Sequence, residues 1–263
     1  MQQFLRLFLF FFFFTITKTV AQQRFSNFEI DAPQLQTKKK IWVYLPLNYE
    51  KSNKKYPVIY MHDAQNLFDA STSYADEWNI DETLDSINAK VIVIGIENTE
   101  GRMDELTPFK NSKYGGGKAD EYLDFIVNTL KPRIDATYRT KTNSKNTAIF
   151  GSSLGGLVSF YAAIKYHNIF GKVGCFSPAF WFNRNEINDL LAKTKDFDTK
   201  IYFLCGDDEG DVDVILDMKN VEHWVNSKRC ECKKLNKEII VKGGQHNEKL
   251  WRDSFKKAYL WLF

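Results

Sequence analysis

The chain has 263 residues, of which 44% are hydrophobic and 15% aromatic, so it can bury one substantial core. Its 36 Lys and Arg nearly balance 33 Asp and Glu, and no basic block is interleaved with aromatic residues. This composition excludes a charge-driven nucleic-acid binder, and no nucleic-acid partner is expected. Four cysteines are too few for a disulfide scaffold, so the fold must depend on its apolar core.

The first residues have the three-part layout of a secretory signal. Arg6 precedes an apolar run from Leu7 to about Thr17, and the small-residue site Thr19-Val20-Ala21 follows. A membrane anchor is the alternative, but the run is shorter than the roughly 20 apolar residues of a spanning helix. We therefore expect a signal peptide over residues 1–21 and a mature protein of residues 22–263, secreted or periplasmic and not stably inserted in the membrane.

Short β-branched and apolar runs then alternate with stretches of helical period, without a linker or repeat. Such alternation predicts a single α/β domain with a mostly parallel central sheet and helices on both faces. The long irregular stretch 98–122 follows one of these runs, so it is a candidate rim of a binding site. The strand-like runs are "IWVYLP", "YPVIYMH", "KVIVIGIE", "NTAIFG", "GKVGCFS", "KIYFLCG" and "KEIIVKG".

The four cysteines divide into two kinds. Cys175 and Cys205 stand in apolar strand-like runs, which predicts buried thiols that act as small hydrophobic residues. Cys230 and Cys232 are separated by one residue and could form a strained local bridge or bind a metal. No second pair of ligands accompanies them, so a metal site is not expected.

The pentapeptide Gly151-Ser152-Ser153-Leu154-Gly155 matches the nucleophile elbow G-x-S-x-G. In that motif the serine occupies a strained strand-to-helix turn, and flanking glycines avoid clashes with the neighbouring strand and helix. The context fits, because "TAIF" before it has β character and "LVSFYAAIKY" after it has helical spacing. Ser153 would then lie at a helix N-terminus, where developing negative charge is stabilised.

A serine hydroxyl needs a base, and the base needs a carboxylate that orients it. The stretch "YFLCGDDEGD" offers Glu209 and, as a competitor, Asp208, directly after a predicted strand. His246 follows the last predicted strand and precedes a final helical pattern, whereas His167 and His223 stand in surface-like helical contexts. The order Ser, acid, His is that of α/β hydrolases.

An acyl-transfer site also needs two N–H donors for the oxyanion. The backbone N–H of Leu154 is the first candidate, because it follows the nucleophile. The second is expected from the loop "YMHDAQNLFD", with Gln65 or Ala64 as the donor. Asp63 in the same loop is interpreted as a residue that holds the loop in place or as an ordinary turn aspartate.

With these residues in view, the chain resembles the "Putative esterase" family of α/β hydrolases, which includes enterochelin-type, feruloyl and acetylxylan esterases. The resemblance runs from "KKKIWVYLP" to "LWLF" and rests mainly on "YPVIYMHDAQNLFD", "FGSSLGGLVSF", "CGDDEGD" and "GGQHNEKLW". It implies Ser153 as nucleophile, His246 as base and Glu209 as acid. The family's loop often has glycine where this chain has Ala64.

Further side chains are candidates for the substrate pocket because they stand near these motifs. Aromatic rings there could stack on a sugar, phenolic or siderophore ring, although each ring could equally be core packing. His62 could instead have a structural or rim role. The candidates are His62, Asp63, Phe68, Trp78, Phe180 and Trp181.

These observations favour an exported serine esterase that needs neither metal nor organic cofactor. Its expected substrates are esters of carbohydrates, such as acetyl or feruloyl esters, or siderophore esters. An acyltransferase with the same triad and a non-catalytic carbohydrate-binding module are the alternatives. A metallohydrolase is disfavoured because no H-E-x-x-H or comparable ligand spacing occurs. The sequence leaves the oligomeric state open.

Overall fold

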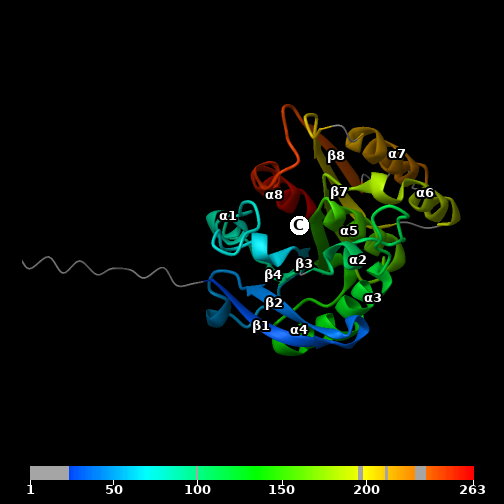
Figure 1. Ribbon diagram of the computed structural model, residues 1–263. Helices are drawn as coiled ribbons and strands as arrows, with labels where there is room; N and C mark the ends of the chain where they lie inside the picture. Colours follow the sequence, from blue (N-terminus) through cyan, green and yellow to red (C-terminus); the bar gives the residue numbers. More distant parts are fainter. Residues whose placement is uncertain (1–23, 99, 195–197, 211–212, 229–234) are drawn as a thin grey trace, which may run out of the picture.

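The computed structural model describes residues 24–98, 100–194, 198–210, 213–228 and 235–263. The expected signal segment 1–21, Cys230 and Cys232 lie outside these residues. Eight described strands form one sheet in the order β1-β2-β4-β3-β5-β6-β7-β8 (Figure 1). The strands are β1 (Phe25–Ala32), β2 (Thr37–Tyr44), β3 (Val58–His62), β4 (Ile92–Ile96), β5 (Thr147–Ser152), β6 (Lys172–Phe176), β7 (Lys200–Gly206) and β8 (Asn236–Val241).

The sheet is parallel from β4 through β3 to β8, and only the β1–β2 and β2–β4 pairs are antiparallel. This confirms the predicted mostly parallel sheet. The seven predicted strand-like runs correspond to β2 through β8. Strand β1, with the sequence FSNFEIDA, was not predicted. Its Ser, Asn and Asp residues have low strand propensity, and it is held in place by its pairing with β2.

Helices cover both faces of the sheet, as predicted (Figure 1). Helices α1 and α8 contact one another on one face, and α5 packs on β5 and β6 on the other. The described α-helices are α1 (Ile80–Ser86), α2 (Arg102–Leu106), α3 (Ala119–Asp124), α4 (Lys131–Thr137), α5 (Leu154–Lys165), α6 (Arg184–Lys193), α7 (Val214–Ser227) and α8 (Glu248–Leu262). No helix in the described ranges is long and apolar enough to cross a bilayer.

The two-residue period of the strands divides the core into two clusters. In β3, Ile59 and Met61 face the cluster under α1 and α8, whereas Val58 and Tyr60 face the cluster under the other helices. Cys175 in β6 and Cys205 in β7 are buried free thiols, as predicted. Because β3 through β8 run parallel, their carboxyl ends lie together at one edge of the sheet. The loops of the candidate site leave the sheet at this edge.

Candidate active site

Ser153 occupies a strained turn between β5 and α5. Its backbone has φ 56° and ψ −121°, a conformation that L-residues rarely adopt. The Ser153 N–H donates to the Phe176 carbonyl at 2.9 Å, and the Ser153 carbonyl accepts from the Ala179 N–H at 3.0 Å. The end of β6 therefore holds the turn in this geometry.

The glycines around Ser153 have unequal steric roles. A Cβ on Gly151 would lie 2.6 Å from the Gly155 carbonyl carbon, so this position requires glycine. A Cβ on Gly155 would meet its nearest neighbour, the His62 Cβ, at 3.4 Å, which is an ordinary contact. The expectation that both flanking glycines prevent a clash is therefore wrong for Gly155 itself. Gly156 is the tighter position, with Phe176 O at 3.1 Å.

His246 is paired with Glu209. The His246 Nδ1 lies 3.0 Å from Glu209 Oε2, and the two side chains are 33% and 3% exposed. Because a carboxylate only accepts, the proton of neutral His246 lies on Nδ1 and Nε2 remains free as a base. Asp208 does not take this position: its carboxylate is exposed and accepts from Gln245 Nε2 at 3.1 Å. Of the two predicted acids, the structure brings Glu209 to His246.

The second oxygen of Glu209 is held by two residues that the sequence did not suggest. Glu209 Oε1 accepts from the Gly206 N–H and from Ser177 Oγ, both at 2.6 Å. Ser177 Oγ in turn accepts from Trp251 Nε1 at 2.9 Å. The Trp251 ring also packs edge-on against His246, with ring centroids 5.2 Å apart. Trp251 therefore contacts the histidine directly and its carboxylate partner through Ser177.

Ser153 and His246 line the same cavity, whose volume is about 860 Å³. Trp251 forms part of its wall, and Gln65 and Arg102 line it as well. Sequence reasoning placed stretch 98–122 at the rim, and Asn98 and Arg102 of that stretch do line the cavity. The remaining lining residues are Asp63, Asn66, Thr72, Ser73, Tyr74, Ala75, Ser152 and Glu248.

Of the predicted oxyanion donors, Gln65 lines the cavity, whereas Leu154 and Ala64 do not. Leu154 is the first residue of α5, so its N–H has no acceptor within the helix. Gln65 lies in the short helix Ala64–Asn66 that follows β3, and it lines the cavity. Ala64 is only 1% exposed and does not line the cavity, so of the two predicted donors Gln65 is the better placed.

Asp63 holds the loop after β3. Its backbone is left-handed (φ 58°), and its carboxylate accepts from Arg102 Nε at 2.6 Å, Arg102 Nη2 at 2.8 Å and Asn98 Nδ2 at 2.8 Å. Burial alone would raise the pKa of Asp63, but the Arg102 charge and these hydrogen bonds outweigh it and lower that pKa. Asp63 therefore acts as the predicted loop anchor, and it also lines the cavity.

His62 does not line the cavity, so it is not a substrate-pocket residue, and of its two predicted roles the structure supports the structural one. It is 2% exposed, and burial lowers its pKa to about 4. Ser159 Oγ donates its only proton to the Gly155 carbonyl at 2.7 Å, so His62 Nε2, 3.1 Å from that oxygen, must donate to it. His62 Nδ1 then accepts from the Tyr122 hydroxyl at 2.8 Å. His62 is thus a neutral structural residue beneath the elbow helix.

The predicted aromatic pocket residues are packing residues. Phe68 stacks on Phe25 and Trp42, and Trp78 stacks on Phe176 and packs beside Trp251. Neither Phe68 nor Trp78 lines the cavity, because both side chains are consumed by the core. Phe180 is buried against Phe160, and Trp181 packs against Tyr114 and Phe182. The aromatic residues that do line the cavity are Tyr74 and Trp251.

One group of carboxylates in the described chain is close enough to hold a metal ion. It consists of Glu77, Asp81 and Glu82, whose ligand atoms lie within 4.8 Å of one another. Burial and a hydrogen bond with Glu82 raise the pKa of Asp81 to about 8. None of the three residues lines the cavity that contains Ser153.

Solved structures with this architecture are α/β-hydrolase esterases. The BES protein from Bacillus cereus matches with a TM-score of 0.73 and 19% identity, over 94% of this chain and 98% of its own. The enterobactin esterase FES from Shigella flexneri matches with a TM-score of 0.71 and 14% identity, over 92% of this chain and 59% of its own. The fold is therefore the α/β-hydrolase fold.

Curated relatives are similar in sequence over varying lengths. "Uncharacterized protein YbbA" from Bacillus subtilis is 25% identical over 84% of this chain and 91% of its own length. The "Siderophore triacetylfusarinine C esterase" of Aspergillus fumigatus is 29% identical over 54% of this chain and 52% of its own. The "Endo-1,4-beta-xylanase/feruloyl esterase" of Xylanibacter ruminicola is 27% identical over 64% of this chain and 22% of its own.

The family comparison covers almost all of the described sheet and its helices. Residues 32–262 match the protein family described as "Putative esterase", from the end of β1 to the end of α8. The match contains the elbow serine, the carboxylate at 209 and the histidine at 246. This chain therefore belongs to the "Putative esterase" family, whose members act on esters.

Proposed function

We propose that the protein is an exported serine esterase in which Ser153, His246 and Glu209 form the catalytic triad. The observation that carries this proposal is the 3.0 Å contact between His246 Nδ1 and Glu209 Oε2, made at the cavity that Ser153 also lines. The strained backbone of Ser153 at the N-terminus of α5 supports its role as the nucleophile.

In the first half of the reaction, Ser153 Oγ attacks the ester carbonyl carbon while His246 Nε2 accepts the hydroxyl proton. The N–H groups of Leu154 and Gln65 stabilise the oxyanion, and Glu209 stabilises the imidazolium. The C–O bond to the alcohol then breaks, and His246 returns the proton to the departing alkoxide. In the second half, water loses a proton to His246 and attacks the acyl carbon. The bond from that carbon to Ser153 Oγ then breaks, His246 returns the proton to Ser153 Oγ, and the acid is released.

We propose esters of carbohydrates, including feruloyl esters, or siderophore esters as the substrate class. The cavity of about 860 Å³ is large enough for a bulky ester, and its wall combines Trp251 with polar side chains such as Asn66 and Arg102. The activities named for the Aspergillus and Xylanibacter relatives agree with this class. Export rests on the N-terminal sequence and predicts a mature N-terminus at Gln22, which mass spectrometry of the secreted or periplasmic protein would test.

The first experiment compares wild type, Ser153→Ala and His246→Ala in the hydrolysis of p-nitrophenyl acetate and butyrate. Each substitution should reduce turnover to near background, because members of a triad act as a unit. His167→Ala is the matched control, since His167 is an exposed histidine outside the cavity. Labelling by a fluorophosphonate should modify Ser153 in wild type. Turnover that persists in Ser153→Ala would show that another residue is the nucleophile.

A further inference from the structure

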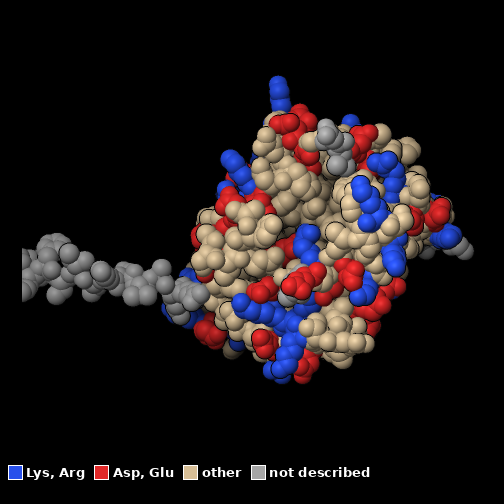
Figure 2. All heavy atoms as spheres, in the orientation of Figure 1, with Lys and Arg blue, Asp and Glu red and all other residues tan. Residues whose placement is uncertain are grey.

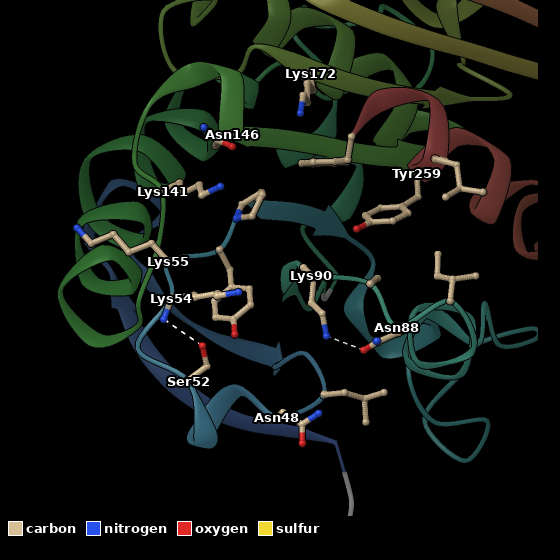
Figure 3. A pocket seen from close by; sticks show the side chains of 17 residues that line it. Asn48, Ser52, Lys54, Lys55, Asn88, Lys90, Lys141, Asn146, Lys172 and Tyr259 are labelled. Carbon is tan, nitrogen blue, oxygen red and sulfur yellow. Dashed lines mark hydrogen bonds between the residues drawn. The ribbon is translucent and has the colours of Figure 1, made fainter.

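A second cavity, of about 680 Å³, lies at the end of the sheet opposite Ser153 (Figure 3). Its wall includes Pro57, which immediately precedes β3, and Asn146, which immediately precedes β5. Lys172, the first residue of β6, lines it as well. Because these strands are parallel, their amino ends lie together at this edge, whereas Ser153 follows the carboxyl end of β5. The cavity is therefore separate from the candidate active site.

The wall of this cavity contains lysines and no acidic residue. Five lysines, from segments far apart in the sequence, line it: Lys54, Lys55, Lys90, Lys141 and Lys172. Figure 3 shows the Lys141 and Lys172 side chains directed into the cavity and Lys55 directed away from it. Lys90 Nζ donates to Asn88 Oδ1 at 2.6 Å, and Lys172 Nζ lies 3.8 Å from the centroid of the Phe263 ring.

The cavity lysines lack acidic partners, as some other lysines of the described chain also do. On the face in Figure 2, Lys and Arg are interspersed with Asp and Glu. Within the described chain, Lys39 pairs with Glu105 and Lys165 with Asp120, but the five cavity lysines have no such ion pair. Burial, and then the charges of Lys200 and Lys141, lower the pKa of Lys172 to about 8. The cavity thus concentrates positive charge without a counter-charge from the protein.

We propose that this cavity binds an acidic oligosaccharide, a sugar chain that carries several carboxylates. The ammonium groups would contact the carboxylates, since lysine is a point charge without the fixed geometry of arginine. Asn48, Ser52 and Asn146 also line the cavity and provide hydrogen-bonding groups for sugar hydroxyls. The binding would involve no residue of the Ser153 site, so it stands independently of the proposed esterase activity.

Two other kinds of polyanion fit the cavity less well. Proteins that bind single-stranded nucleic acid stack bases on aromatic faces, but Tyr56 and Tyr259 in this wall are only 5% and 8% exposed. The Phe263 ring is 37% exposed, but it stacks on Tyr259 and has Lys172 Nζ 3.8 Å from its centroid. The wall also has no arginine, the side chain best suited to phosphate and base recognition. An anionic membrane requires a surface that lies flat on it, whereas these lysines surround a hollow.

The test is calorimetric titration of the purified protein with oligogalacturonate at low ionic strength, with a neutral malto-oligosaccharide of the same length as the comparison ligand. Wild type should bind the acidic chain and not the neutral one. The double variant Lys54→Gln/Lys141→Gln should weaken binding about tenfold, because it removes two of the ammonium groups that would contact carboxylates. Added salt should weaken wild-type binding, since exposed charges are screened.

The double variant Lys38→Gln/Lys237→Gln is the matched control, because it removes two exposed lysines outside this cavity. Its affinity should stay within about twofold of wild type, since exposed charges outside the contact contribute little. Hydrolysis of p-nitrophenyl acetate and the thermal midpoint report that each variant is folded. The proposal is overturned if wild type does not bind oligogalacturonate, if the control weakens binding equally, or if single-stranded DNA or anionic vesicles bind more tightly. Inactive wild type that still binds would contradict only the esterase proposal.

Discussion

Two histidines, His246 at the cavity and His62 packed against α5, have surroundings that differ in exposure and in hydrogen-bond partners. His246 is 33% exposed, lines the cavity and donates to the carboxylate of Glu209. His62 is 2% exposed, lies between the hydroxyls of Tyr122 and Ser159, and has a pKa lowered to about 4. The imidazole is the same in both places. A carboxylate partner and access to the cavity suit His246 to catalysis, while burial among neutral groups suits His62 to support.

The largest expected effect is that of His246→Ala on catalysis. We expect kcat/KM for p-nitrophenyl butyrate to fall by about 10⁴-fold or more, because the proposed nucleophile Ser153 would lose its proposed base. The thermal midpoint should stay close to that of wild type, since His246 is partly exposed and makes one side-chain ion pair. Steady-state kinetics and differential scanning calorimetry measure both quantities. A variant that unfolds easily but retains activity when folded would reverse the roles assigned to the two histidines.

Glu209→Gln should have the next largest effect. Loss of the carboxylate leaves the His246 tautomer unfixed and the imidazolium unstabilised, and we expect kcat to fall by about 10²–10⁴-fold. Asp208→Asn is the matched control and should change kcat by less than about twofold, because an exposed carboxylate outside the triad contributes little. Equal losses in both variants would contradict the assignment of Glu209.

His62 should instead govern how stability depends on pH. Its folded pKa of about 4 is below the usual 6.5, so the folded state binds fewer protons than the unfolded state between these values. The stability from neutral His62 is fully present above pH 6.5 and is lost as pH falls toward 4. Over that range the loss amounts to about 3 kcal/mol.

Asp81 and Glu248 have raised pKa values, so their effect on stability as pH falls is opposite in sign to that of His62. Both carboxyls are present in wild type and in His62→Gln, so the difference between these two proteins isolates His62. Urea unfolding should show that the stability advantage of wild type over His62→Gln shrinks by about 3 kcal/mol between neutral pH and pH 4. A constant difference across this range would mean that His62 does not titrate as its burial requires.

Trp251→Phe should give the smallest effect. The substitution keeps an aromatic ring beside His246 but removes the Nε1–H that donates to Ser177 Oγ. That is one neutral hydrogen bond, and the Ser177 hydroxyl in turn donates to Glu209. We expect kcat to fall by about three- to tenfold, because loss of this hydrogen bond should raise the activation free energy by about 1 kcal/mol. Ser177→Ala should give a larger loss, since it removes a direct bond to Glu209. An unchanged kcat in both variants would show that this network does not position the acid.

The alternation of apolar strand-like runs with helical runs was sufficient to predict the parallel sheet and its coverage on both faces. The strand-turn-helix motif and the residues after the later runs predicted the proposed triad. Regular apolar runs and a strand-turn-helix motif are local signals, and they are encoded by neighbouring residues. The edge strand β1 was missed because its sequence is polar at several positions and its pairing with β2 is a tertiary contact. The choice between Asp208 and Glu209 likewise depended on which carboxylate turns toward His246.

The predicted pocket was less accurate, for a physical reason. Phe68 and Trp78 follow the same early loop as Gln65, but a residue's nearness to a motif does not specify which side of the backbone its side chain takes. Ser177 and Trp251 form bonds across 74 positions of the chain, so no local pattern identifies their partnership. The available signal was that Trp251 lies five residues after His246 in the sequence. Its contact with His246 and its hydrogen bond to Ser177 are seen only in the folded structure.

The two buried cysteines have a consequence for the redox behaviour of the protein. Burial raises the pKa of Cys175 well above its usual range and that of Cys205 to about 12. At neutral pH, both thiols therefore stay protonated, and the reactive thiolate form is scarce. Oxidation and thiol exchange start from the thiolate, so both residues are protected from peroxide and from mixed disulfides. These two positions can therefore stay reduced in an oxidising compartment.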